Sequence, residues 1–91
     1  MGNDLYWKIT PKPIEEELHA LSYDSWHVLA YIYQHDKECL DGLIFDKDDL
    51  SKLMLIKKVA QAFSQTDFID DISSIINAIE KHGSITFIIR G

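Results

Sequence analysis

The stretches DLYWKIT, residues 4–10, and SITFIIRG, residues 84–91, decide the fold. In the first, the apolar residues Leu5, Trp7 and Ile9 alternate with Tyr6, Lys8 and Thr10. Successive side chains of a β-strand point to opposite faces of a sheet, so the apolar residues share one face. The second stretch alternates in the same way. Because each strand has an apolar face that must be buried, we expect the two ends of the chain to share one sheet.

Two helices are predicted in the first half of the chain. The first runs from about Pro13 to Leu21, because proline suits the first helical turn and the acidic residues after it suit the positive N-terminus of a helix. The second is the segment SWHVLAYIYQH, residues 25–35, with Asp24 or Ser25 as its N-cap.

The second half of the chain holds a short apolar run and two more helices. LIF, residues 43–45, is expected to add a third strand, since two strands alone are marginally stable. Asp46 then caps a helix whose LMLI run, residues 53–56, is apolar on all sides and indicates either deep burial or an exposed apolar strip. Thr66 or Asp67 caps the last helix, which ends at a glycine. Its apolar stripe consists of Phe68, Ile69, Ile72, Ile75, Ile76 and Ile79.

These elements define the fold class as α+β. The predicted order is β-α-α-(β)-α-α-β, with the terminal strands in one small sheet and the four helices covering one of its faces. A length of 91 residues fits a single domain, residues 1–91, with one modest core.

Charge and composition exclude several classes of partner. Fifteen acidic residues against nine basic residues give a formal net charge of −6, which repels phosphate backbones, so we expect no nucleic-acid partner. The apolar runs are too short to cross a bilayer, so we expect no membrane partner. The first ten residues lack the regions of a signal peptide, and a single cysteine fits a reducing compartment. A cytoplasmic protein is therefore expected.

Metal and cofactor motifs do not fit the sequence. The acid-rich segments at residues 36–42 and 46–49 do not place glycine at the sixth position of a calcium loop. His35 and Cys39 lie four residues apart but lack the further ligands that a structural zinc ion needs. We expect no metal, no cofactor and no catalytic residue.

The predicted partner-binding surface is the sheet face that the helices leave uncovered. Tyrosine is enriched at interfaces because it combines apolar area with a polar tip, and an open sheet face or edge can bind another chain. We therefore interpret the chain as a non-enzymatic protein–protein interaction module. The expected contact residues are Tyr6, Lys8, Thr86, Ile88 and Arg90.

Two other functions remain open. His27, with Asp24 and Tyr23 near it in the sequence, could serve a small-ligand-binding domain or a minor enzyme through acid–base chemistry. Alternatively, the sheet face or edge could join two copies of the chain in a homodimer.

The segments LYWKITPKP, residues 5–13, and IINAIEKHGSI, residues 75–85, carry a resemblance. They resemble a group of small bacterial and phage-associated proteins of no known activity, which open with an LYWKP-like strand and finish with a helix ending in AIEKHG and a strand. In this chain Ile9 and Thr10 separate Lys8 from the proline. We expect the interaction module to act as an inhibitor or accessory factor of a phage or mobile element, and the resemblance implies a bacterial or phage origin. It implies no mechanism.

Overall fold

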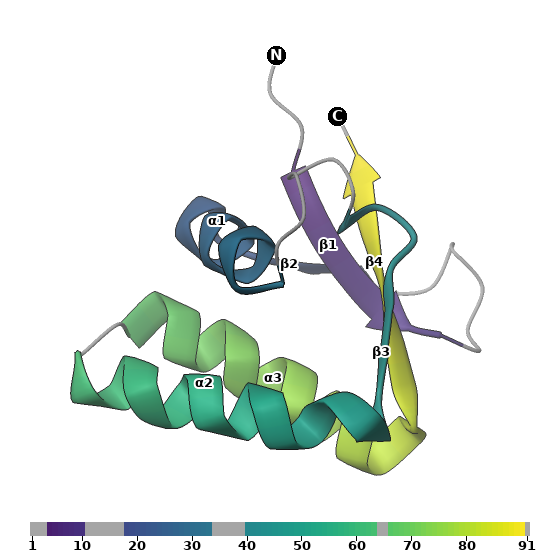
Figure 1. Ribbon diagram of the computed structural model, residues 1–91. Helices are drawn as coiled ribbons and strands as arrows, with labels where there is room; N and C mark the ends of the chain where they lie inside the picture. The colour runs from purple at the N-terminus through teal and green to yellow at the C-terminus, as the bar shows by residue number, and fades with distance from the viewer. Residues whose placement is uncertain (1–3, 11–17, 34–39, 64–65, 91) are drawn as a thin grey trace.

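The computed structural model describes residues 4–10, 18–33, 40–63 and 66–90 (Figure 1). Its α+β class agrees with the sequence prediction. In chain order the elements are β1 (Asp4–Ile9), β2 (His19–Ala20), α1 (Tyr23–Ile32), β3 (Ile44–Asp46), a 3-10 turn (Lys47–Asp49), α2 (Leu50–Ala62), α3 (Thr66–His82) and β4 (Ser84–Arg90).

The four described strands form one antiparallel sheet in the order β2-β1-β4-β3. The two ends of the chain pair at its centre, where Trp7 of β1 lies opposite Phe87 of β4. The prediction that the terminal strands share one sheet is therefore confirmed. The strand predicted at residues 43–45 is also confirmed, one residue later, as β3 on the outer side of β4.

The described helices all lie on one face of this sheet (Figure 1). α3 packs against β1 and β4, while α1 and α2 both pack against α3. The stripe predicted for α3 is confirmed, because every member except the half-buried Ile69 is buried. It meets the inward-facing side chains of the strands in a single core. These strand residues are Leu5, Trp7, Phe45, Ile85 and Phe87.

The first predicted helix is wrong where the structure describes it. Residues 13–17 lie outside the described residues, and the segment after them contains β2 in place of a helical turn. His19 stacks on Trp7 with ring centroids 4.1 Å apart, and the Leu21 amide donates to the Leu5 carbonyl at 3.0 Å. Pairing with the edge of β1 therefore overrides the helical spacing of the apolar residues.

α1 begins earlier than predicted, because Ser22 and not Asp24 or Ser25 is its N-cap. The backbone of Ser22 is extended, and its Oγ accepts a hydrogen bond from the Ser25 amide at 3.1 Å. This is the geometry of a serine cap. The described helix ends at Ile32, and residues 34–35 of the predicted helix lie outside the described residues.

The other caps follow local signals more closely. Asp46 caps the turn that leads into α2, and its Oδ1 accepts from the Asp48 amide at 2.9 Å, as predicted. Gly83 ends α3 with φ of 101°, a left-handed conformation that glycine adopts without steric cost. Thr66 is already helical, so the predicted cap at Thr66 or Asp67 is wrong by at least one residue.

Candidate functional site

The most prominent apolar surface of the described residues lies on α2. Leu55, Val59 and Phe63 are 62%, 52% and 71% exposed. They recur every four residues, so they form one strip along the helix and its C-cap. The sequence offered deep burial or an exposed apolar strip for the LMLI run, and the structure shows both. Leu53 is fully buried, whereas Met54 and Leu55 are exposed.

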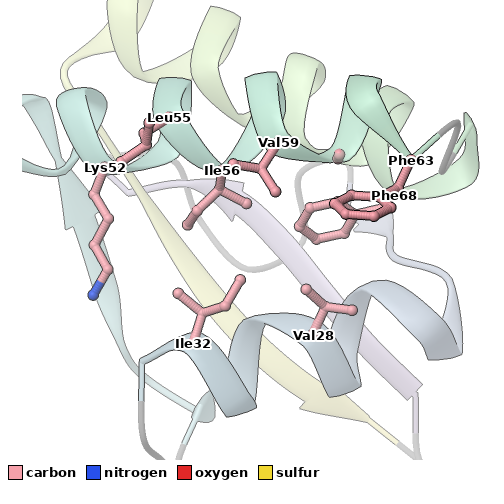
Figure 2. A pocket seen from close by; sticks show the side chains of 9 residues that line it. Val28, Ile32, Lys52, Leu55, Ile56, Val59, Phe63 and Phe68 are labelled. Carbon is pink, nitrogen blue, oxygen red and sulfur yellow. The ribbon is translucent and has the colours of Figure 1, made fainter.

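This strip is one wall of an apolar groove between α1 and α2 (Figure 2). Val28 and Ile32 point from α1 toward α2 and form the opposite wall, and Phe68 of α3 closes one end beside Phe63. The groove has a volume of about 530 Å³. It exists because α1 and α2 each pack on α3, so that apolar side chains of both helices face a space that neither fills.

The helix α2, which forms one wall of the groove, is basic. Residues 50–62 contain Lys52, Lys57 and Lys58 and no acidic residue. Lys52 is the charged member of the groove lining, at the end opposite Phe63 (Figure 2). Its Nζ lies 4.0 Å from the centroid of the Tyr33 ring, a cation–π contact. The groove thus combines an apolar lining with positive charge on one rim, in a chain of net charge −6.

Tyr33, whose ring contacts this lysine, is the C-cap residue of α1. Its ring packs on Phe45 with centroids 4.7 Å apart, and its hydroxyl is buried with no hydrogen-bond partner among the residues that the structure describes. Burial, with a smaller contribution from the negative charge of Asp49, raises the pKa of Tyr33 to about 12. The folded protein therefore favours the neutral phenol.

This pKa predicts a loss of stability in alkali. The contribution of Tyr33 is fully present below the ordinary tyrosine pKa of 10.0 and should disappear as the pH rises to about 12. Tyr33→Phe should remove this part of the pH dependence, measured by urea unfolding at a series of alkaline pH values. All other residues are the same in the two proteins, so the difference between their pH profiles reports Tyr33 alone. An identical pH profile for the two proteins would contradict the assignment.

The five residues predicted for a partner surface do share the sheet face opposite the helices. Tyr6 lies opposite Ile88 and Lys8 lies opposite Thr86, with Arg90 further along β4. Ile88, however, is only 9% exposed, so the expectation that it forms exposed surface is wrong. The alternating pattern shows which face of the sheet a side chain is on, and not how far that side chain is covered.

The polar residues of this face are also engaged with one another. Thr10 Oγ1 and Thr86 Oγ1 share a hydrogen bond of 2.9 Å. Lys8 Nζ donates to the Thr10 carbonyl at 3.1 Å. The large apolar side chain exposed here is Ile44 of β3, opposite Thr86, which the sequence did not single out. Among the described residues, this face thus has Ile44 as an exposed large apolar side chain, whereas the groove has Leu55, Val59 and Phe63.

The candidate acid–base residues lie together on the outer side of α1. Tyr23, Asp24 and His27 are all exposed, and the rings of Tyr23 and His27 meet edge to face with centroids 4.2 Å apart. None of the three lines the groove. The structure thus brings these residues together on open surface and places them outside the apolar site.

A buried polar network fixes the position of α1, and with it one wall of the groove. Ser25 is fully buried, and its Oγ donates to Asp71 Oδ2 of α3 at 2.5 Å. The Ser22 amide donates to the same oxygen at 3.0 Å. The Asp71 carboxylate thereby places a negative charge at the N-terminus of α1, where such a charge stabilises the helix. A cap signal was visible in the sequence, but the partner 49 residues away was not.

Comparison with known proteins gives no information on the function. No family model matches the chain, and neither the curated proteins nor the solved structures yield a match. Within the described part of the chain, no helix is long and apolar enough to span a membrane. Its His, Cys, Asp and Glu side chains form no group of three or more that could hold a metal ion. His35 and Cys39 lie outside the described residues.

Proposed function

We propose that this protein is a non-enzymatic protein–protein interaction module that binds its partner in the α1–α2 groove. The observation that carries the proposal is that the exposed strip of Leu55, Val59 and Phe63 lines a groove whose other wall consists of apolar side chains of α1. Contiguous exposed apolar surface of this kind marks interaction sites. Binding would remove it from water, and a few well-packed apolar or aromatic residues supply most of the affinity of an interface.

The groove is a better candidate than the sheet face suggested by the sequence. Ile88 is buried there, and Thr86 and Lys8 already make hydrogen bonds within the protein. A partner on that face would have to compete with these contacts. In the groove, by contrast, apolar side chains are exposed and a partner would displace only water.

The resemblance of the two terminal segments supports a biological setting for the module. As part of the same proposal, the protein is of bacterial or phage origin and acts in the cytoplasm as an inhibitor or accessory factor of a phage or mobile element. Such a role requires a partner-binding surface and no chemistry of its own.

The test is a matched pair of charge insertions. Val59→Glu places a carboxylate in the groove, whereas Ser74→Glu places one at an exposed position of α3. The wild type and Ser74→Glu, used as bait in a lysate of the source organism, should each capture the same stoichiometric partner. Val59→Glu should bind the purified partner at least about tenfold more weakly, because a carboxylate would be buried among apolar groups. All three proteins should unfold at similar denaturant concentrations.

The opposite results are equally clear. A partner retained by Val59→Glu would place the interface elsewhere, and the absence of any partner would remove the basis for a module of this kind. A doubled mass in solution that Val59→Glu restores to a single copy would identify a homodimer and contradict a separate partner.

A further inference from the structure

We propose that the occupant of the groove is an acidic amphipathic α-helix of the partner protein. This inference rests on the proposed function and names the chemistry that the groove recognises. It follows from the shape of the groove, from the charge of its rim and from the exclusion of two other occupants.

The shape of the groove fits a helix. Its α2 wall extends from Lys52 to Phe63, which corresponds to about 16 Å of helix axis, or three turns of a partner helix. Val28 and Ile32 line the other side, so a helix seated here would contact α1 and α2 together. Helix-in-groove recognition uses apolar side chains at positions i, i+3 or i+4, and i+7.

The charge of the rim selects an acidic helix. Lys52 is the charged residue of the groove lining, and the lining contains no acidic residue. A carboxylate that flanks the apolar stripe of a bound helix would lie beside this ammonium group. Basic side chains in the same positions would be repelled. Complementary charge of this kind raises the association rate and sets the choice of partner.

A second copy of the chain fits the groove less well. A two-fold contact places the same patch of both copies face to face. A two-fold contact through the groove would oppose α2 of one copy to α2 of the other, and this helix carries three lysines and no acidic residue between residues 50 and 62. Like charges opposed in this way disfavour the complex.

A small apolar ligand is also a poorer fit. Ligand pockets normally enclose about 70–90% of the surface of the molecule they bind. Here the α2 wall is open, since Leu55 and Phe63 are more than half exposed. A helix can cover such an open wall, because it brings its own apolar face to the site.

The experiment is a selection from displayed peptides of random sequence, about four helical turns long. Peptides that bind the wild type are kept, and those that also bind Val59→Glu are discarded. Enriched sequences should carry apolar residues at helical spacing, flanked by Asp or Glu. A synthetic peptide of this sequence should become helical on binding, as measured by circular dichroism. Phe63→Ala should weaken its affinity at least about tenfold, as expected when a large aromatic contact of an interface is removed.

A charge exchange tests the acidic requirement directly. Lys52→Glu should weaken binding of the selected peptide by about tenfold, and changing the facing peptide Glu to Lys should restore it. Lys81→Glu, at an exposed position of α3, makes the same change of charge away from the groove and should have no effect.

The outcomes separate this inference from the proposed function. Groove-dependent peptides that are basic, or that lack helical spacing, would overturn the acidic helix and leave the interaction module standing. Absence of enrichment would also overturn the acidic helix, while the capture of a partner by the wild type and not by Val59→Glu decides the module independently. Saturable binding of dodecanoate that Val59→Glu abolishes, without peptide enrichment, would assign the groove to a fatty acid.

Discussion

Phe87→Ala should lower the free energy of unfolding by about 3–5 kcal/mol, the range for deletion of a buried aromatic ring. Phe87 is fully buried on β4, opposite Trp7, and its ring meets that of Phe45 edge to face with centroids 4.9 Å apart. Its backbone also bonds to the loop before β3, because its carbonyl accepts from the Gly42 amide at 2.8 Å. The strands around the ring cannot close the resulting cavity without breaking the sheet register. Since small domains are stable by only about 5–15 kcal/mol, this loss would remove a large fraction of the free energy of unfolding.

The matched control is Phe63→Ala, the same substitution at an exposed position in the groove. Its free energy of unfolding should stay within about 0.5 kcal/mol of the wild type, since it makes no cavity. Urea or guanidinium unfolding measures both variants. Similar free energies for the two variants would mean that Phe87 is not in the core and that the pairing of β1 with β4 is misassigned.

Asp71→Ala should lower the free energy of unfolding by about 2–3 kcal/mol, because it removes a charged acceptor from buried donors. The Asp71 carboxylate accepts from the Ser22 amide and from the Ser25 hydroxyl, and Ser25 has no exposed surface. Without it, the fully buried Ser25 hydroxyl and the partly buried Ser22 amide lose a strong acceptor. The N-terminus of α1 also loses the negative charge that favours a helix start. Amide hydrogen exchange should therefore accelerate most in the first turns of α1.

Asp70→Ala is the control for this prediction, because Asp70 is the exposed neighbour of Asp71 on the same helix. Its effect should stay within about 0.5 kcal/mol. Equal effects of the two substitutions would show that helix charge, and not the buried network, accounts for the loss. A stable Asp71→Ala variant with unchanged exchange in α1 would contradict the network itself.

Local patterns in the sequence determined much of this fold. Alternation in residues 4–10 and 84–91 places the strands, and the strong stripe of α3 places its buried face, because both patterns follow directly from the geometry of one element. Asp46 and Gly83 mark the ends of elements for the same reason, since their roles depend on neighbours within three or four residues along the chain.

Tertiary contacts decided the rest. His19 belongs to a strand because the edge of β1 and the ring of Trp7 are available to it, and Ser22 caps α1 with the help of Asp71 on another helix. Similarly, the sequence of α2 could not tell that Leu53 would be buried and Leu55 exposed in a groove, nor that Ile88 would be covered. Exposure depends on which elements pack against a side chain, and those elements are distant in the sequence. The strands and helices could thus be predicted from their own residues, whereas the site arises from the space left between α1 and α2 when both pack on α3.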